Sequence, residues 1–231
     1  MPIDKVVASA EVALEGLEDG AVVLVGGFGG AGAPRALLGA LAAKGLRDLT
    51  LVTNNAGAQG DGIELLLRAG AVTKIICSYP NSPGATAFEE CYREGTVRLE
   101  LTPQGTLSER IRAAGAGIGG FYVRTGVGTE LAAGKEERVL DGVRYVFERP
   151  LGGDVALICA AAADRWGNLT YDKSARNFAP TMAAAATRTV VQAERIVELG
   201  ALDPEVIVTP GIFVDAVVHV PRAAATGVAD A

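Results

Sequence analysis

The chain has 231 residues, of which 49% are hydrophobic, 21% charged and 5% aromatic, and its formal net charge is −6. This composition excludes a disordered, a collagen-like and a disulfide-scaffold protein, and the negative charge argues against binding to nucleic acid or to an anionic membrane. No apolar run approaches the roughly 20 residues of a membrane-spanning helix. Asp4 and Lys5 stand where the apolar part of an export signal would begin, and the three cysteines share no CxxC spacing, so we expect a cytoplasmic location.

Apolar periodicity and turn residues predict the secondary structure in chain order. The predicted elements are helix 4–17, strand 21–25, helix 35–44, strand 49–53, helix 62–69, strand 74–77, helix 86–93, strand 97–101, helix 107–114, strands 143–147 and 155–159, helix 183–186 and strand 206–208. Short apolar strands that alternate with amphipathic helices are typical of an α/β fold with an open, largely parallel sheet flanked by helices. We expect a small antiparallel insertion around residues 143–159, a single domain over residues 1–222 and a disordered tail over 223–231.

A glycine-rich loop separates the first predicted strand from the next helix. Gly27, Gly29 and Gly32 match the pattern G-x-G-x-x-G, which in a dinucleotide-binding fold is accompanied by an acidic residue at the end of the second strand. Here that strand ends in residues 53–55, Thr-Asn-Asn, and Asp48 precedes it. An NAD site therefore rests on the glycines alone. The loop suits a tight turn before a helix, or a close approach of a ligand or partner chain to the backbone.

Three side-chain amides follow predicted strands at the edge where ligands of open α/β sheets bind. Asn54 and Asn55 follow strand 49–53, and Gln104 follows strand 97–101. Amides can bind a carbonyl or a carboxylate without adding charge, although each of these residues also suits a simple turn. A hydrolase nucleophile motif and a phosphate-binding P-loop are missing from the sequence, and one histidine, His219, with dispersed cysteines argues against a metal site.

Seven motifs in order resemble those of family I CoA-transferases. They are DGAVVLVGGFGGAGAP at 19–34, TNNAG at 53–57, KIICSYP at 74–80, TPQGTLSER at 102–110, DRWGNLTY at 164–171, ARNF at 175–178 and VTPGI at 208–212. The resemblance extends to about residue 220 and is strongest to the A (alpha) subunit of 3-oxoacid CoA-transferases, of the 3-oxoadipate or the succinyl-CoA:acetoacetate type.

The resemblance implies an enzyme that moves CoA from an acyl-CoA donor, often succinyl-CoA, to a 3-oxo acid by a ping-pong route. In the family a glutamate of the B (beta) subunit, within a Glu-Asn-Gly-like segment, is the nucleophile and carries the CoA thioester. This chain has no Asn-Gly dipeptide. The resemblance thus implies that the chain holds no catalytic nucleophile, works with a beta subunit in an α2β2 assembly, and uses coenzyme A as a substrate with no tightly bound cofactor.

The resemblance also assigns roles to the two groups of residues found above. The glycine-rich stretch of the family lies around CoA, and here it corresponds to Gly26, Gly27, Phe28, Gly29, Gly30, Ala31 and Gly32. The polar residues that line the shared substrate pocket correspond to Asn54, Asn55 and Gln104. Whether the loop contacts CoA or packs against the partner subunit stays open, as does the acceptor acid. The alternatives are an NAD-binding oxidoreductase, a CoA- or sugar-phosphate-binding module and an acetate/butyrate-type subunit.

Overall fold

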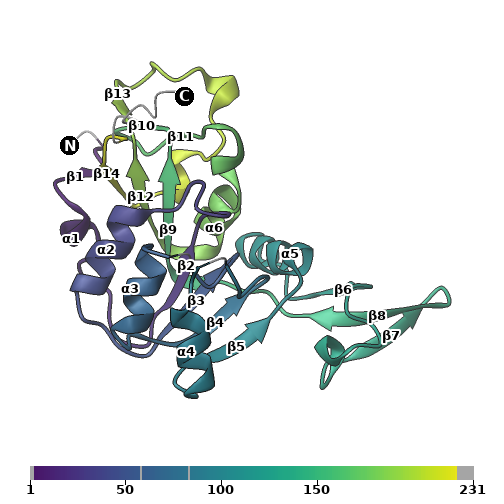
Figure 1. Ribbon diagram of the computed structural model, residues 1–231. Helices are drawn as coiled ribbons and strands as arrows, with labels where there is room; N and C mark the ends of the chain where they lie inside the picture. Colours follow the sequence, from purple (N-terminus) through teal and green to yellow (C-terminus); the bar gives the residue numbers. More distant parts are fainter. Residues whose placement is uncertain (1–2, 58, 83, 223–231) are drawn as a thin grey trace, which may run out of the picture.

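The computed structural model describes residues 3–57, 59–82 and 84–222 (Figure 1). Its main feature is a fully parallel eight-stranded sheet in the order β1-β14-β12-β9-β2-β3-β4-β5. The strands are β1 (Val6–Val7), β2 (Val22–Val25), β3 (Leu49–Thr53), β4 (Val72–Cys77), β5 (Arg98–Leu101), β9 (Gly153–Ala160), β12 (Ala186–Ala193) and β14 (Ala216–His219). The predicted tail over 223–231 lies outside the described residues, and the single domain over 1–222 stays a prediction.

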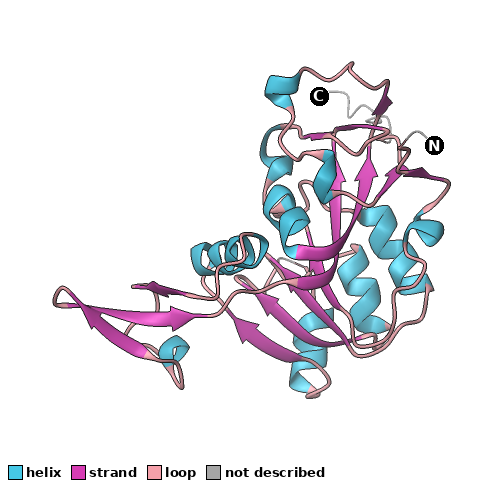
Figure 2. Cartoon of the chain, turned by 180° about the vertical axis from the view of Figure 1, so that it is seen from behind, coloured by secondary structure: helices cyan, strands magenta, loops and turns pink. Residues whose placement is uncertain are grey.

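Helices cover both faces of this sheet (Figures 1 and 2). One face carries α1 (Ala10–Ala13), α2 (Arg35–Ala43), α3 (Gly62–Arg68) and α4 (Ala87–Arg93), and the other carries α5 (Gln104–Gly115) and α6 (Ala179–Ala185). The predicted α/β fold with a largely parallel sheet is therefore confirmed. None of the helices in the described ranges combines the length and the apolar character needed to cross a bilayer.

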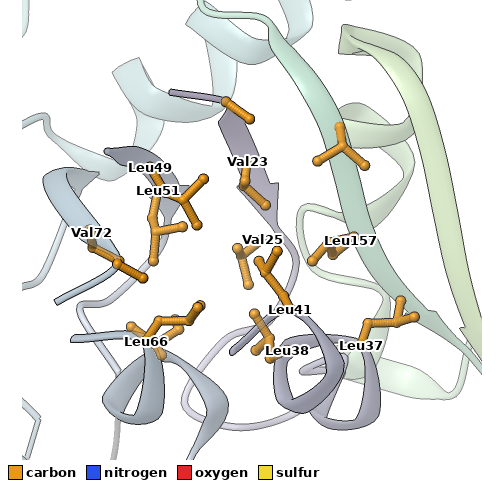
Figure 3. Packing of buried hydrophobic residues seen from close by; sticks show 14 of the residues in the cluster. Val23, Val25, Leu37, Leu38, Leu41, Leu49, Leu51, Leu66, Val72 and Leu157 are labelled. Carbon is orange, nitrogen blue, oxygen red and sulfur yellow. The ribbon is translucent and has the colours of Figure 1, made fainter. Parts of the chain in front are cut away.

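Alternation along the strands divides the core into two layers. Val23 and Val25 pack against leucines of α2 and α3, whereas Leu24 between them belongs to the core under α5 and α6 (Figure 3). Burial of a leucine or valine side chain contributes about 1.5–3 kcal/mol. Because both faces are buried, the central strands read as continuous apolar runs, and this is why β2 and β3 are predictable from the sequence.

Two small sheets accompany the main one. An antiparallel sheet of β6 (Phe121–Val123), β8 (Val143–Glu148) and β7 (Glu137–Leu140) extends away from the body of the molecule (Figures 1 and 2). The other sheet contains β11 (Leu169–Thr170), β10 (Ala162–Asp164) and β13 (Ile196–Val197). Four 3-10 helices complete the described chain, at η1 (Glu130–Ala132), η2 (Lys173–Arg176), η3 (Pro204–Val206) and η4 (Gly211–Phe213).

The expected insertion around 143–159 is correct only in its first strand. β8 lies in the antiparallel sheet, but β9 is a central strand of the main sheet, paired in parallel with β12 and β2. Its residues 155–160 are buried, in agreement with the apolar run from Val155 to Cys159. The insertion therefore spans residues 121–148, and Pro150 and Gly152 lie in the connection back to the sheet.

Three other predicted elements are wrong in type or extent. The helix over 4–17 is reduced to α1, because Val6 and Val7 instead pair with β14 as an edge strand. The helix at 183–186 is the end of α6, after which β12 begins at Ala186. The strand at 206–208 is absent from the described chain, where η3 ends at Val206.

Candidate functional site

The loops that follow β2, β3, β4 and β5 meet at the carboxyl edge of the parallel sheet, the usual place for a ligand in an open α/β fold. An isolated parallel bridge between Asn55 and Tyr79 continues the pairing of β3 and β4 beyond their ends. Two large apolar side chains are exposed at this edge: Tyr79 is 60% exposed and Phe28 is 48% exposed.

A hydrogen-bonded cluster of three polar side chains lies over β3, β4 and β5. Oδ1 of Asn54 accepts from Nε2 of Gln104 at 2.8 Å and lies 2.9 Å from the hydroxyl oxygen of Ser78. The same hydroxyl lies 3.1 Å from the main-chain oxygen of Asn54. Gln104 is the first residue of α5 and Ser78 follows the last residue of β4, so three different strand ends position this group.

The cluster fixes the orientation of the Asn54 amide. Because the side chains of Ser78 and Gln104 both donate toward Oδ1, the Nδ2 group of Asn54 must occupy the opposite side of the amide. Asn54 is only 5% exposed, and Nδ2 has no acceptor within the described part of the chain. This side chain therefore presents a nearly buried, oriented N–H group, which is suited to a carbonyl or carboxylate oxygen.

The three predicted amide side chains do not all belong to this cluster. Asn54 and Gln104 are brought into contact, whereas Oδ1 of Asn55 accepts from the N–H of Gly57 at 3.3 Å and supports the turn after β3. Sequence reasoning did not single out Ser78. Its position directly after a predicted buried strand is the signal that could have identified it.

The glycine-rich loop forms a miniature β-hairpin at the end of β2. Phe28 and Ala31 exchange two backbone hydrogen bonds of 3.0 Å around Gly29 and Gly30. Both central residues have positive φ, of 54° and 87°, which is the requirement of a type I′ turn and explains why glycine occupies both positions. Phe28 is thereby presented at the surface next to the turn.

The hairpin leaves several backbone amides without partners. Over the described ranges the N–H groups of Gly29, Gly30, Gly32 and Ala33 have no hydrogen-bond acceptor. α2 begins directly after them at Arg35, so its positive N-terminal end adds to the same region. Such a group of free amides suits an anionic or carbonyl oxygen.

A cleft of about 590 Å³ lies beside the hairpin. Residues 30–33 of the loop form one wall, and Arg35, Lys173 and Arg222 are among the other lining residues. Arg222 pairs with Asp172 at 3.7 Å, whereas Arg35 and Lys173 form no ion pair within the described ranges. Asp172 and Glu194 also line the cleft, and both lie within 4.0 Å of Arg222. Arg35 and Lys173, which are not in ion pairs within the described chain, lie beside the free amides and make this part of the cleft suitable for phosphate groups.

Two titratable groups in the cleft are neutral at ordinary pH. Burial raises the pKa of Tyr171 to about 12, and its hydroxyl shares a 2.7 Å hydrogen bond with Thr209. Burial also raises the pKa of the Cys159 thiol to about 11. Neither side chain supplies an ionised nucleophile near neutral pH. The described residues include no group of three His, Cys, Asp or Glu arranged for a metal ion, and His219 is exposed at the end of β14.

The sequence is similar to those of known coenzyme A transferases. Residues 7–220 match the family described as Coenzyme A transferase. The chain is 54% identical to the A subunit of 3-oxoadipate CoA-transferase from Pseudomonas putida, over 99% of both chains. It is 47% identical to the A subunit of a probable succinyl-CoA:3-ketoacid coenzyme A transferase from Bacillus subtilis, over 93% of this chain and 89% of that protein.

Solved structures share the fold. The acyl-CoA transferase YdiF of E. coli O157:H7, as a thioester complex with CoA, superimposes with a TM-score of 0.84 at 24% identity, over 96% of this chain. The present chain spans only 48% of that polypeptide. A cysteine-to-serine variant of the decarboxylase AibA/AibB superimposes with a TM-score of 0.79 at 26% identity, over 94% of this chain and 84% of that one.

Proposed function

Since the chain belongs to the coenzyme A transferase family and is a CoA-transferase subunit of the A type, we propose that it joins a B subunit to transfer CoA from succinyl-CoA to a 3-oxo acid. Identities of 54% and 52% to the A subunits of two 3-oxoadipate CoA-transferases favour 3-oxoadipate as the acceptor. Acetoacetate is the second candidate, favoured by the 47% identity to a subunit named for 3-ketoacids.

The observation that carries the proposal is the oriented N–H donor of Asn54. In the proposed reaction a glutamate carboxylate from the B subunit first attacks the thioester carbonyl and expels the CoA thiolate, which leaves an acyl-glutamyl anhydride. The thiolate attacks the glutamyl carbonyl and releases succinate, which leaves a glutamyl-CoA thioester. Each addition places negative charge on a carbonyl oxygen, and Nδ2 of Asn54 is positioned to donate to it.

The acceptor acid completes the cycle by the same steps in reverse. Its carboxylate attacks the glutamyl-CoA thioester, and the released thiolate then attacks the acyl side of the new anhydride. The products are the 3-oxoacyl-CoA and the free glutamate. The proposal assigns Asn54 and Gln104 to the pocket for the reacting carbonyl, with Asn55 forming the adjacent turn.

We assign the glycine hairpin, residues 26–32, to acyl-CoA binding. The free amides of Gly29 and Gly30 suit oxygen atoms of the CoA chain, and Arg35 and Lys173 in the cleft suit its phosphates. No cofactor is needed beyond CoA, which is a substrate in this scheme.

The nucleophile has to come from the partner chain. The sequence contains no Asn-Gly segment of the kind that carries the family's glutamate. The exposed Phe28 and Tyr79 flank the edge where Asn54 lies, as expected of a surface that a B subunit covers. We propose an α2β2 assembly and, from the composition and the three free cysteines, a cytoplasmic location.

The decisive experiment measures transferase activity of this chain alone, of the isolated B subunit, and of the mixture. Succinyl-CoA is the donor, and 3-oxoadipate, acetoacetate and acetate are tested as acceptors. We expect activity only in the mixture, with the highest kcat/KM for 3-oxoadipate. Full turnover by the isolated chain would overturn the half-enzyme assignment. Saturable thermal stabilisation of the chain by NAD(H), without stabilisation by CoA, would support an oxidoreductase instead.

A further inference from the structure

A single side chain holds both ends of the glycine hairpin. Oδ1 of Asn177 accepts from the N–H of Gly27 at 2.9 Å and from the N–H of Phe178 at 2.7 Å. Nδ2 of the same amide donates to the carbonyl oxygens of Ala31 at 3.1 Å and of Ala175 at 2.8 Å. Asn177 therefore connects the start of the hairpin, its end and the segment that follows η2.

The backbone at Asn177 is held in an unfavourable conformation. Its φ is 28° and its ψ is −123°, outside the regions that residues with a side chain ordinarily adopt. Lys173, at the start of the same 3-10 helix, also has a positive φ, of 49°. Strain of this kind persists only where the surroundings fix the conformation, and it occurs often at binding sites. Four hydrogen bonds of the Asn177 amide that are 3.1 Å or shorter supply such a constraint.

The hairpin and the Asn177 segment are in direct contact. A Cβ atom added at Gly32 would overlap the carbonyl oxygen of Ala175 and would lie 2.7 Å from Nδ2 of Asn177. Glycine at 32 is therefore required for the approach of Asn177, in addition to its φ of 67°. The two segments lie about 150 positions apart in the sequence, and this contact is specific to the folded structure.

We propose that Asn177 is a positioning residue for acyl-CoA binding, which acts by fixing the glycine hairpin so that the amides of Gly29 and Gly30 are aligned before the ligand arrives. The inference rests on the assignment of the hairpin to acyl-CoA under the proposed function. Asn177 itself does not contact the ligand, because both N–H groups and both acceptor positions of its amide are already used within the chain.

The kinetic test uses the variants Asn177→Ala and Asn177→Asp in the complete complex with the B subunit. We expect the KM for succinyl-CoA to rise about tenfold in both, the equivalent of about one lost hydrogen bond, while the KM for the 3-oxo acid changes less than about twofold. Asp preserves the size and the acceptor but removes the donors to Ala31 and Ala175. If Asn177→Asp retained the wild-type KM, the role of these donor bonds would be overturned.

A matched control separates positioning from general stability. Asn168 also joins two loops through its amide, donating to Oδ2 of Asp164 at 2.8 Å and accepting from Gly211 N–H at 2.9 Å. We expect Asn168→Ala to lower Tm by an amount comparable to Asn177→Ala and to leave the KM for succinyl-CoA unchanged. An equal rise of this KM in both variants would reduce Asn177 to a residue of general stability.

A second readout does not depend on catalysis. Hydrogen exchange followed by mass spectrometry should show faster exchange over residues 26–32 in Asn177→Ala than in the wild type, and no such change in Asn168→Ala. If the wild-type complex lacked transferase activity, the proposed function would fail. The exchange measurement would still test whether Asn177 holds the glycine hairpin in place. Unchanged exchange together with an unchanged KM would overturn the inference.

Discussion

The side-chain amide of Gln104 donates a 2.8 Å hydrogen bond to Oδ1 of Asn54, across the end of the intervening strand β4. The bond joins residues 50 positions apart and directs the Asn54 N–H group away from Gln104. The Gln104 side chain is exposed, so it adds little buried surface, and its main effect is to orient the amide of Asn54.

Gln104→Ala should lower kcat of the complex by about tenfold to a hundredfold, because Asn54 loses one of the two bonds that fix its donor. The unfolding temperature should change little, since the side chain is exposed. Ser108→Ala, one turn further along α5, is the matched control and should retain wild-type kcat. Steady-state kinetics with succinyl-CoA and thermal unfolding of each variant test both parts. A kcat loss of the same size in Ser108→Ala would show that α5 as a whole, rather than Gln104, is sensitive.

Gly32→Ala should destabilise the chain far more than a glycine replacement with the same backbone conformation elsewhere. Gly32 and Gly45 have φ of 67° and 72°, but a Cβ at Gly45 would meet no atom within 4 Å. We expect Gly45→Ala to cost about 1–2 kcal/mol from the left-handed backbone alone. The clash with Ala175 and Asn177 should raise the cost of Gly32→Ala above about 3 kcal/mol. Chemical unfolding of both variants measures the difference, and equal losses would contradict the contact.

The pKa of Glu100 predicts one component of acid unfolding. Burial raises this pKa, but hydrogen bonds from Lys74 at 2.6 Å and Arg110 at 2.8 Å outweigh burial and bring it below its ordinary value of 4.5. A carboxyl group whose folded pKa is depressed stabilises the protein above its unfolded pKa. That contribution is lost as the pH falls from about 4.5 through the folded value. The free energy of unfolding should therefore decrease over this range.

Glu100→Gln should remove this component and flatten the decrease below pH 4.5. It should also lower the stability at pH 7, because Lys74 loses its anionic partner and Arg110 keeps only the more distant Glu148, at 3.9 Å. Glu109→Gln serves as the control. Glu109 pairs with Arg112 at 2.8 Å on the exposed side of α5, and such a pair contributes little. Urea unfolding between pH 3 and pH 7 distinguishes the two. Identical pH profiles for the two variants would show that the Glu100 pairing does not contribute.

The cysteines should differ in reactivity. Burial raises the pKa of Cys77 and of Cys159 to about 11, so at pH 8 each is on the order of 0.1% thiolate. Cys91 is half-buried on α4. We expect one thiol to react rapidly with a disulfide reagent in the native protein and all three to react in denaturant. The Cys91→Ser variant should lose the fast phase, and a remaining fast phase would show that a buried thiol is accessible.

The central half of the sheet is predictable from the sequence because its strands are buried on both faces. The apolar run at 49–53 predicts a strand and forms β3, and the pattern over 35–44 predicts a helix and forms α2 to within one residue. β12 escapes prediction because it follows an alanine-rich helix without a turn residue between them. In the sequence, Val6 and Val7 fit the apolar face of a helix as well as they fit a strand. They form a strand because they pair with β14, which is distant in the sequence.

Part of the candidate site can be predicted from the positions at which the parallel strands end, and part cannot. Strand ends place Asn54 and Gln104 at one edge, since neighbouring parallel strands end together. The place of Ser78 directly after a buried strand indicates the same edge of the sheet. The hydrogen bond of the Ser78 hydroxyl to Asn54 depends on the direction of the Ser78 side chain. The hydrogen bond between Gly27 and Asn177 joins residues that are 150 positions apart. The direction of the Ser78 hydroxyl and the contact of Asn177 with the hairpin leave no periodic pattern in the sequence, so only the folded structure reveals these two features.

The pairing of Val6 with Val217 and of Val7 with Val218 has a consequence for synthesis on the ribosome. β2, β3, β4 and β5 can pair with one another as soon as residue 101 has emerged. β1 has to wait, because its only partner in the described sheet is β14, which follows all the other strands of that sheet in the chain. β1 is therefore synthesised more than 200 residues before the strand that orders it. Until β14 has been made, the backbone N–H and C=O groups of β1 have no neighbouring strand to pair with.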